Sequence, residues 1–171
     1  MLTGKAVDQL VRRVKSLAAD ADCGGALQRI CELLRHEVPW YDWVGYYLAV
    51  PAERLLVLGP FAGAPTEHLR IPYGRGICGQ AAASGLTFVV PDVAAESNYL
   101  SCSVHTRAEI VVPLFHRRAL VGELDIDSHT ADPFTSTDTR LLGRIARITA
   151  PLAAALVPPP DQPVNASSST R

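Results

Sequence analysis

The segment 123–127, with the sequence ELDID, alternates strictly between acidic and apolar side chains. Such alternation is typical of a β-strand whose two faces meet different surroundings, because successive side chains point to opposite sides. Glu123, Asp125 and Asp127 therefore share one face. The preceding stretch 110–114 is strongly apolar, so the acidic face is either solvated or the wall of a polar pocket. Closely spaced carboxylates raise one another's pKa, and this face could donate a proton or bind an ammonium group.

The composition predicts one globular domain with a full-sized core. The chain has 171 residues, of which 48% are hydrophobic and 19% charged, as in ordinary folded domains. We expect residues 1–156 to form a single domain that includes the N-terminal helices. Residues 157–171, VPPPDQPVNASSSTR, have no core-forming pattern and are expected to form a disordered tail.

Charge and cysteine usage exclude several functions. The net charge is −1 and no basic run occurs, so we expect no nucleic-acid binding. No apolar stretch reaches the roughly 18 residues of a membrane span, and the N-terminus lacks the apolar core of a signal peptide. We therefore expect a cytoplasmic protein that binds no membrane. The four cysteines are then expected to be thiols, and because none forms a Cys-x-x-Cys pair we expect neither a metal nor a cofactor.

Hydrophobic periodicity predicts an α+β fold. Apolar residues at helical spacing predict helices over 4–19, 25–37 and 138–156, and the small residues of 76–84 fit a short helix. Strand-like runs occur at 41–49, 54–58, 88–90, 109–115 and 119–127. The segment 59–75, rich in Gly and Pro, is predicted to be loop, and 94–108 a long loop or short helical turn. Short connections between neighbouring strands indicate hairpins, hence an antiparallel sheet with the terminal helices on one face.

Two cysteines lie where a thiol could react. Cys102 lies in a polar loop with His105 and Arg107 nearby in sequence, which could stabilise its thiolate; the alternative is a small residue packed beneath the loop. Cys78 lies early in the helix 76–84, where a helix N-terminus favours the thiolate. The alternative for Cys78 is close packing of a small residue against the sheet. The nearby glycines do not complete a nucleotide-binding fingerprint.

Aromatic residues and a further acid could complete a pocket. Trp43 and Tyr47, with Gly45 between them, share one face of the strand 41–49. Aromatic rings beside a glycine can form a pocket wall, and a Trp ring can stabilise a cation; ordinary core packing is the alternative. Glu109 begins the strand expected to pair with the acidic strand and would add a carboxylate to its face.

Together these motifs resemble those of the GAF-domain free methionine-(R)-sulfoxide reductases. The segments that carry the resemblance are WVGYY (43–47), LGPFAG (58–63), GRGICGQAA (74–82), PDV (91–93), EIVVP (109–113) and LDIDS (124–128). They occur in order and with compatible spacing between about residues 40 and 150. The resemblance implies a GAF fold with a six-stranded antiparallel sheet flanked by helices, usually in a homodimer.

The resemblance also implies roles for individual residues. Cys102 matches the nucleophilic cysteine, and Cys78 matches a second cysteine able to form a disulfide with it. Asp125 and Asp127 match acids that act in catalysis as well as in binding. The implied substrate-binding residues are Trp43, Tyr47, Glu109, Asp125 and Asp127.

The implied reaction is the reduction of free methionine-(R)-sulfoxide to methionine. The Cys102 thiolate attacks the sulfoxide sulfur while a carboxyl group with a raised pKa supplies a proton to the oxygen. Cys102 becomes a sulfenic acid, Cys78 condenses with it to a disulfide, and a thioredoxin-like reductant restores both thiols. An acidic pocket also favours a free amino acid over a peptide-bound residue, because only the free molecule carries an ammonium group.

The sequence departs from the family pattern at two places. Members commonly have a third cysteine about ten residues before the position of Cys78, and the segment 65–70 here reads PTEHLR. The segment 95–103, AESNYLSCS, also differs from the usual loop before the nucleophile. Both departures favour the alternative, which is a non-catalytic GAF module that binds a small molecule or senses redox state.

Overall fold

The computed structural model describes residues 2–100 and 105–157. Its elements are α1 (Gly4–Leu17), α2 (Cys23–Glu37), β1 (Trp43–Val50), β2 (Leu55–Ala62), β3 (Arg70–Pro72), α3 (Gly76–Ser84), β4 (Phe88–Val90), β5 (Ala108–His116), β6 (Ala119–Ser128) and α4 (Ser136–Leu156). Short 3-10 turns, Pro51–Glu53 and Val93–Ala95, follow β1 and β4.

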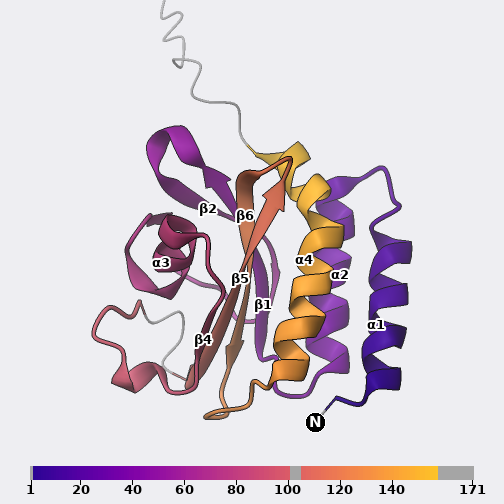
Figure 1. Cartoon of the computed structure of the whole chain (residues 1–171), viewed down its shortest axis with the longest axis horizontal. Helices are drawn as coiled ribbons and strands as arrows, with labels where there is room; N and C mark the ends of the chain where they lie inside the picture. Colours follow the sequence, from indigo (N-terminus) through magenta and orange to yellow (C-terminus); the bar gives the residue numbers. More distant parts are fainter. Residues whose placement is uncertain (1, 101–104, 158–171) are drawn as a thin grey trace, which may run out of the picture.

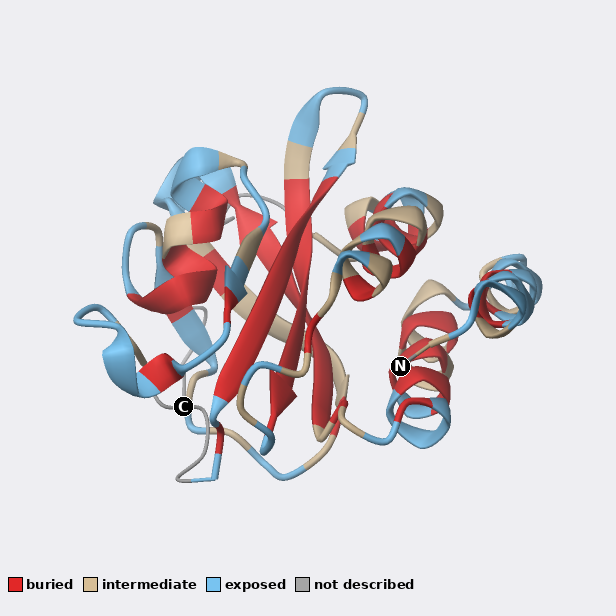
Figure 2. Ribbon diagram, turned by 60° about the horizontal axis from the view of Figure 1, so that its bottom comes forward, coloured by how far each residue is buried: buried red, intermediate tan, exposed pale blue. Residues whose placement is uncertain are grey.

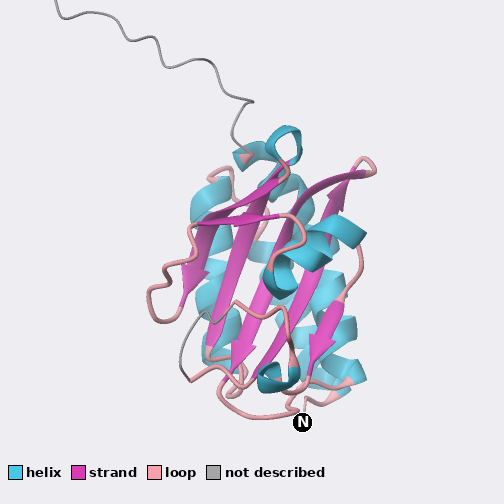
Figure 3. Ribbon diagram, turned by 90° about the vertical axis from the view of Figure 1, so that its left-hand side faces the viewer, coloured by secondary structure: helices cyan, strands magenta, loops and turns pink. Residues whose placement is uncertain are grey.

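In this part of the chain the strands form one antiparallel sheet of six, in the order β3-β2-β1-β6-β5-β4. Helices α1, α2 and α4 lie on one side of the sheet, and α3 lies on the other (Figure 1). Figure 3 looks onto the face that α3 covers. The expected α+β fold with about six antiparallel strands and flanking helices is confirmed.

The two faces of β6 explain why the chain has two cores. Leu124 and Ile126 belong to the larger core, between the sheet and α1, α2 and α4. Glu123, Asp125 and Asp127 alternate with them and so face α3. The smaller core on the α3 side includes Trp43, Tyr47 and Cys78. The central strands are therefore buried on both faces, as Figure 2 shows.

Helix α4 is fixed to the sheet by its first turn. Thr135 and Asp138 form a capping box, in which the Thr135 amide and hydroxyl donate to Asp138 Oδ2 at 2.9 and 2.7 Å. The other oxygen of Asp138 accepts from Trp40 Nε1 at 3.1 Å and from the Tyr41 hydroxyl at 3.0 Å. A buried carboxylate with these donors holds the start of α4 to the chain entering β1.

The expected loop over 59–75 is wrong at residues 59–62 and 70–72, which belong to strands. Strand β2 continues to Ala62, where it pairs with Val44, and β3 pairs Ile71 with Leu56. The register shifts between Gly45 and Tyr47, opposite this part of β2. Such an irregularity accommodates the Gly and Pro residues of β2 that argued for a loop.

Two other expectations concern parts of the chain that are not described. Residues 158–171, nearly all of the expected tail, and Cys102 lie outside the described residues.

None of the described helices is both long and apolar enough to cross a membrane.

Candidate functional site

Four buried carboxyl groups form the centre of the candidate site. Glu109, Glu123, Asp125 and Asp127 are each at most 2% exposed. Glu109 of β5 lies directly opposite Asp127 of β6 in the ladder, so their side chains are neighbours on the same face. Burial at this level excludes the alternative of a solvated acidic face. We call these four residues the acid cluster.

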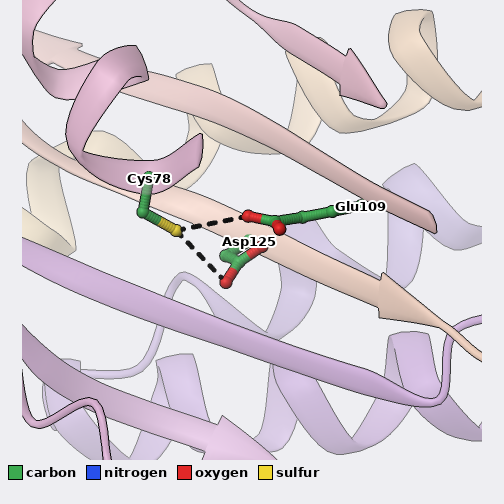
Figure 4. Close-up of side chains that lie close together, drawn as sticks. All are labelled: Cys78, Glu109 and Asp125. Atoms are coloured by element: carbon green, nitrogen blue, oxygen red, sulfur yellow. Dashed lines mark hydrogen bonds between the residues drawn. The ribbon is translucent and has the colours of Figure 1, made fainter. Parts of the chain in front are cut away.

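Helix α3 places a thiol against the acid cluster. Cys78, in the first turn of α3, lies 3.6 Å from Glu109 Oε1 and 3.4 Å from Asp125 Oδ2, measured from Sγ (Figure 4). The thiol donates to these carboxylates, which opposes the thiolate form that a helix N-terminus alone would favour. The thiolate expected for Cys78 from its position in the helix stays a prediction.

Burial dominates the protonation of the acids. It raises the pKa of Glu109 well above the usual value, and the charges of Asp125 and Asp127 raise it further. It also raises the pKa of Glu123, an effect that the nearby Cys78 thiol partly offsets. The pKa of Asp125 rises to about 7, again through burial and against the opposing effect of Cys78. At least part of the cluster therefore carries protons near neutral pH.

Two acids of the cluster have carboxylate oxygens that could accept further hydrogen bonds. Neither carboxylate oxygen of Glu123 meets a hydrogen-bond partner among the described residues, and the same holds for Asp125 Oδ1. A buried acceptor without a partner is costly. These oxygens therefore suit a ligand that brings donors or positive charge.

Strand β1 supplies an aromatic wall beside the acids. Trp43 pairs with Asp127 and Tyr47 with Glu123 across the β1–β6 ladder. The Trp43 ring stacks on Phe61, with centroids 5.5 Å apart, and lies 6.3 Å from the Tyr47 ring. A Cβ at Gly45 would overlap the Trp43 ring, so the glycine makes room for the indole.

Backbone carbonyls of the β2–β3 connection fix both aromatic side chains. Trp43 Nε1 donates to the Ala64 carbonyl and the Tyr47 hydroxyl to the His68 carbonyl, each at 3.0 Å. The polar tips of the rings are thus satisfied, and their apolar bodies face the site.

A pocket of about 150 Å³ opens at the end of the cluster. Trp43 and Asp127 contribute to its wall; the other lining residues are Arg35, Asp42, Ala64, His105, Thr106 and His129. The His105 and His129 rings lie 5.7 Å apart. A second, much smaller cavity of about 10 Å³ borders Cys78 and Glu109.

The structure brings together most of the residues expected from the sequence. Trp43, Tyr47, Cys78, Glu109, Asp125 and Asp127 lie on the α3 side of the sheet around the acid cluster. Glu123 lies on the predicted acidic face and His105 lies near Cys102 in sequence, but neither was expected among the catalytic or substrate-binding residues. No role was expected of the pocket residues Thr106 and His129. Alternation along the strand places Glu123 on the same face as Asp125, whereas His105 and Thr106 lie in the loop before β5 and His129 lies in the loop after β6.

Comparison with known proteins agrees with this architecture. Residues 10–150 match the GAF domain family. The chain is 33% identical to free methionine-R-sulfoxide reductase of Escherichia coli over 129 residues, which are 75% of this chain and 76% of that protein. It is 40% identical to protein YtsP of Bacillus subtilis over 114 residues, 67% of this chain and 69% of YtsP.

Solved structures show the same likeness. A crystal structure of free methionine-R-sulfoxide reductase from Neisseria meningitidis, in complex with its substrate, superposes with a TM-score of 0.82 at 37% identity, covering 91% of this chain and 95% of that chain. The chain therefore belongs to the GAF domain family, and within it resembles the free methionine-R-sulfoxide reductases.

Proposed function

We propose that this protein is an oxidoreductase that reduces free methionine-(R)-sulfoxide to methionine. The observation that carries the proposal is the acid cluster, four buried carboxyl groups beside an aromatic wall and a pocket of about 150 Å³. Relatives that bear the name of this activity support it, as does the substrate complex of the Neisseria meningitidis protein.

The chemistry of the pocket suits a free amino acid. An ammonium group supplies donors and positive charge to carboxylate oxygens that have no hydrogen-bond partner among the described residues, namely Asp125 Oδ1 and both oxygens of Glu123. The face of Trp43 offers an apolar surface to the methyl sulfoxide end. A peptide-bound residue has no ammonium group and would leave the acids uncompensated, so we propose selectivity for the free molecule.

The proposed reaction begins at Cys102. Its thiolate attacks the sulfoxide sulfur, and a protonated acid, with Asp125 and Asp127 as candidates, supplies a proton to the oxygen. The protonated oxygen is then transferred to Cys102: the S–O bond of the substrate and its bond to the Cys102 sulfur break, and a bond between oxygen and the Cys102 sulfur forms. Methionine leaves and Cys102 becomes a sulfenic acid, so that the substrate sulfur gains the two electrons that Cys102 loses. The raised pKa of Asp125, about 7, keeps this proton available at neutral pH.

Cys78 is the proposed resolving thiol. It attacks the Cys102 sulfenic acid, water leaves, and a Cys78–Cys102 disulfide forms. A thioredoxin-like reductant then supplies two electrons and two protons and restores both thiols.

We further propose that the protein works as a homodimer in the cytoplasm.

The first experiment measures methionine released from racemic free methionine sulfoxide with dithiothreitol. We expect the parent to consume only the R form, and Cys102→Ser to abolish turnover. Cys23→Ser is the matched control, because Cys23 lies at the start of α2 on the other side of the sheet, and it should leave the rate unchanged. A folded parent that consumes no sulfoxide would refute the proposal.

A non-catalytic GAF module remains the second candidate. The position ten residues before Cys78 is His68, where family members commonly have a cysteine. In that case the parent would bind free methionine sulfoxide without turnover, and Cys102→Ser would retain nearly the same affinity. Calorimetric titration of both proteins separates this module from the enzyme.

A further inference from the structure

The Cys78 thiol and the carboxyl groups of Glu109 and Asp125 lie close enough together to bind one metal ion. One ligand atom from each of Cys78, Glu109 and Asp125 lies within 4.8 Å of the other two (Figure 4). The three residues come from α3, β5 and β6, so that packing of the helix on the sheet creates the arrangement. All three are buried.

The two sulfur–oxygen distances within this group match those of a tetrahedral zinc site. Zn–S bonds of about 2.3 Å and Zn–O bonds of about 2.0–2.2 Å, at a tetrahedral angle, place sulfur and oxygen ligands about 3.5 Å apart. Cys78 Sγ lies 3.6 Å from Glu109 Oε1 and 3.4 Å from Asp125 Oδ2. An ion could therefore bind between these atoms with little movement of the backbone.

Glu123 provides an independent sign of a ligand. Its side chain is fully buried, neither of its oxygens has a hydrogen-bond partner among residues 2–100 and 105–157, and it lies close enough to Cys78 to interact with the thiol. Asp125 Oδ1 is likewise without a partner in this part of the chain. Coordination of a cation would satisfy buried oxygens that otherwise remain uncompensated.

The small cavity next to the group has the size of a single ion or water. It measures about 10 Å³ and is lined by Cys78 and Glu109 together with Ile71, Arg75, Ile77 and Leu100 among others. A volume near 10–15 Å³ is about the least that holds one water molecule. Of the proposed ligands, Cys78 and Glu109 line this cavity.

We propose that Cys78, Glu109 and Asp125 bind one Zn²⁺ ion, with Glu123 as the fourth ligand after its side chain turns toward the ion. The thiolate ligand selects zinc and its softer relatives over Mg²⁺ and Ca²⁺, which prefer oxygen ligands alone and higher coordination numbers. One sulfur and two carboxylates are in place for the four-coordinate shell of Zn²⁺, and Glu123 supplies the fourth ligand after this movement. On binding, the Cys78 thiol and any protonated acids release their protons to solvent.

The zinc site shares its acids with the proposed substrate site. If the proposed function holds, zinc excludes the substrate ammonium group and inhibits the reductase competitively. Zinc binding itself does not depend on that activity, because its ligands and geometry are independent of turnover. A binding measurement therefore tests the site even if the protein is not a reductase.

The test titrates Cd²⁺, a zinc surrogate with a thiolate-to-metal absorption band in the ultraviolet, into reduced protein in a non-chelating phosphine reductant. We expect one ion per chain with a single-thiolate band, and Zn²⁺ should displace it. Cys78→Ser should abolish the band, and Glu123→Gln should weaken binding by roughly tenfold or more. Cys102→Ser and Cys23→Ser are controls that should retain the band.

Two outcomes overturn the proposal. One is the absence of saturable one-to-one binding by the parent, and the other is a band that survives Cys78→Ser. Near-ultraviolet circular dichroism of each variant shows whether the fold is kept. If Cys78→Ser does not fold, the affinity of Glu123→Gln decides, since an unchanged affinity would exclude the carboxylate from the site.

Discussion

Asp125 is a residue whose protonation couples folding to pH. Its carboxyl group is fully buried beside Glu109, and burial raises its pKa from 3.8 to about 7. Between these two values the folded protein holds a proton on Asp125 that the unfolded chain has released. The free energy of unfolding that this group contributes therefore decreases as pH rises from about 4 to about 7.

We predict that Asp125→Asn removes this pH dependence. Asparagine has similar shape and no charge, so the variant should gain stability relative to the parent as pH rises, by on the order of 2–4 kcal/mol between pH 4 and pH 8. Urea unfolding across this range measures the difference. Glu67→Gln, at an exposed carboxylate, is the control and should follow the parent. A constant difference between Asp125→Asn and parent would contradict the assignment.

Gly45 determines where the Trp43 ring lies. A Cβ at position 45 would overlap the indole and approach Phe61 Cβ to 3.0 Å, and the indole is held by its stack on Phe61. We predict that Gly45→Ala lowers the free energy of unfolding by about 1–3 kcal/mol and weakens binding of the substrate, since the pocket wall must shift.

Trp43 fluorescence in a Trp40→Phe background, where it is the only tryptophan, reports the displacement of the ring. The control is Gly24→Ala, because a Cβ there meets only Asp22 Oδ1 at 3.8 Å, an ordinary contact. An unchanged emission spectrum in Gly45→Ala would show that the ring does not depend on the glycine.

At the scale of elements, the placement of α3 decides whether the site forms. Gly79 lies where the helix meets β3: its carbonyl accepts from the Gly74 amide at 2.6 Å, and a Cβ would overlap the Pro72 carbonyl oxygen. Cys78 is the preceding residue, so the distance of α3 from the sheet also sets the contact of the thiol with the acid cluster.

We predict opposite effects for two glycine-to-alanine changes in helices. Gly79→Ala should destabilise the protein by about 1–3 kcal/mol because backbone must move. Gly143→Ala, in α4 where a Cβ meets nothing within 4 Å, should stabilise it by about 0.5–1 kcal/mol through helix propensity. Chemical denaturation of both variants measures these effects. If the two changes altered the free energy of unfolding equally, the close approach of α3 to the Pro72 carbonyl at Gly79 would not affect stability.

At the scale of the whole molecule, the larger core extends from the N-terminal helices to the end of α4. The larger core joins α1, α2 and α4 to the sheet and already includes Leu152 and Ala153 near the end of α4. Residues 158–171 add no core-forming pattern. We predict that their removal shifts the midpoint of thermal unfolding by less than about 2 °C, which is less than the shift caused by a change of about 1 kcal/mol in the free energy of unfolding. A decrease of several degrees would assign these residues a structural role.

Local patterns in the chain were sufficient for much of the fold. The helix 76–84 and the strand 88–90 were predicted with the bounds that α3 and β4 have, because a run of small residues, a short apolar run and nearby Gly or Pro residues are properties of short segments. The shared face of Glu123, Asp125 and Asp127 was likewise predictable, because alternate residues of a strand point to the same side. The sequence resemblance also identified the GAF family, which the comparisons confirm.

Other features depended on contacts between distant segments. Strand β3 forms because Ile71 pairs with Leu56, and no pattern within three residues predicts such a partner. Likewise, parity placed the acids on one face, but only the packing of α3 over that face decides that they are buried, that Cys78 meets Glu109 and Asp125, and that Glu123 joins them. Side-chain alternation is determined by backbone geometry along one strand, whereas burial and its effect on pKa are determined by what packs against that strand.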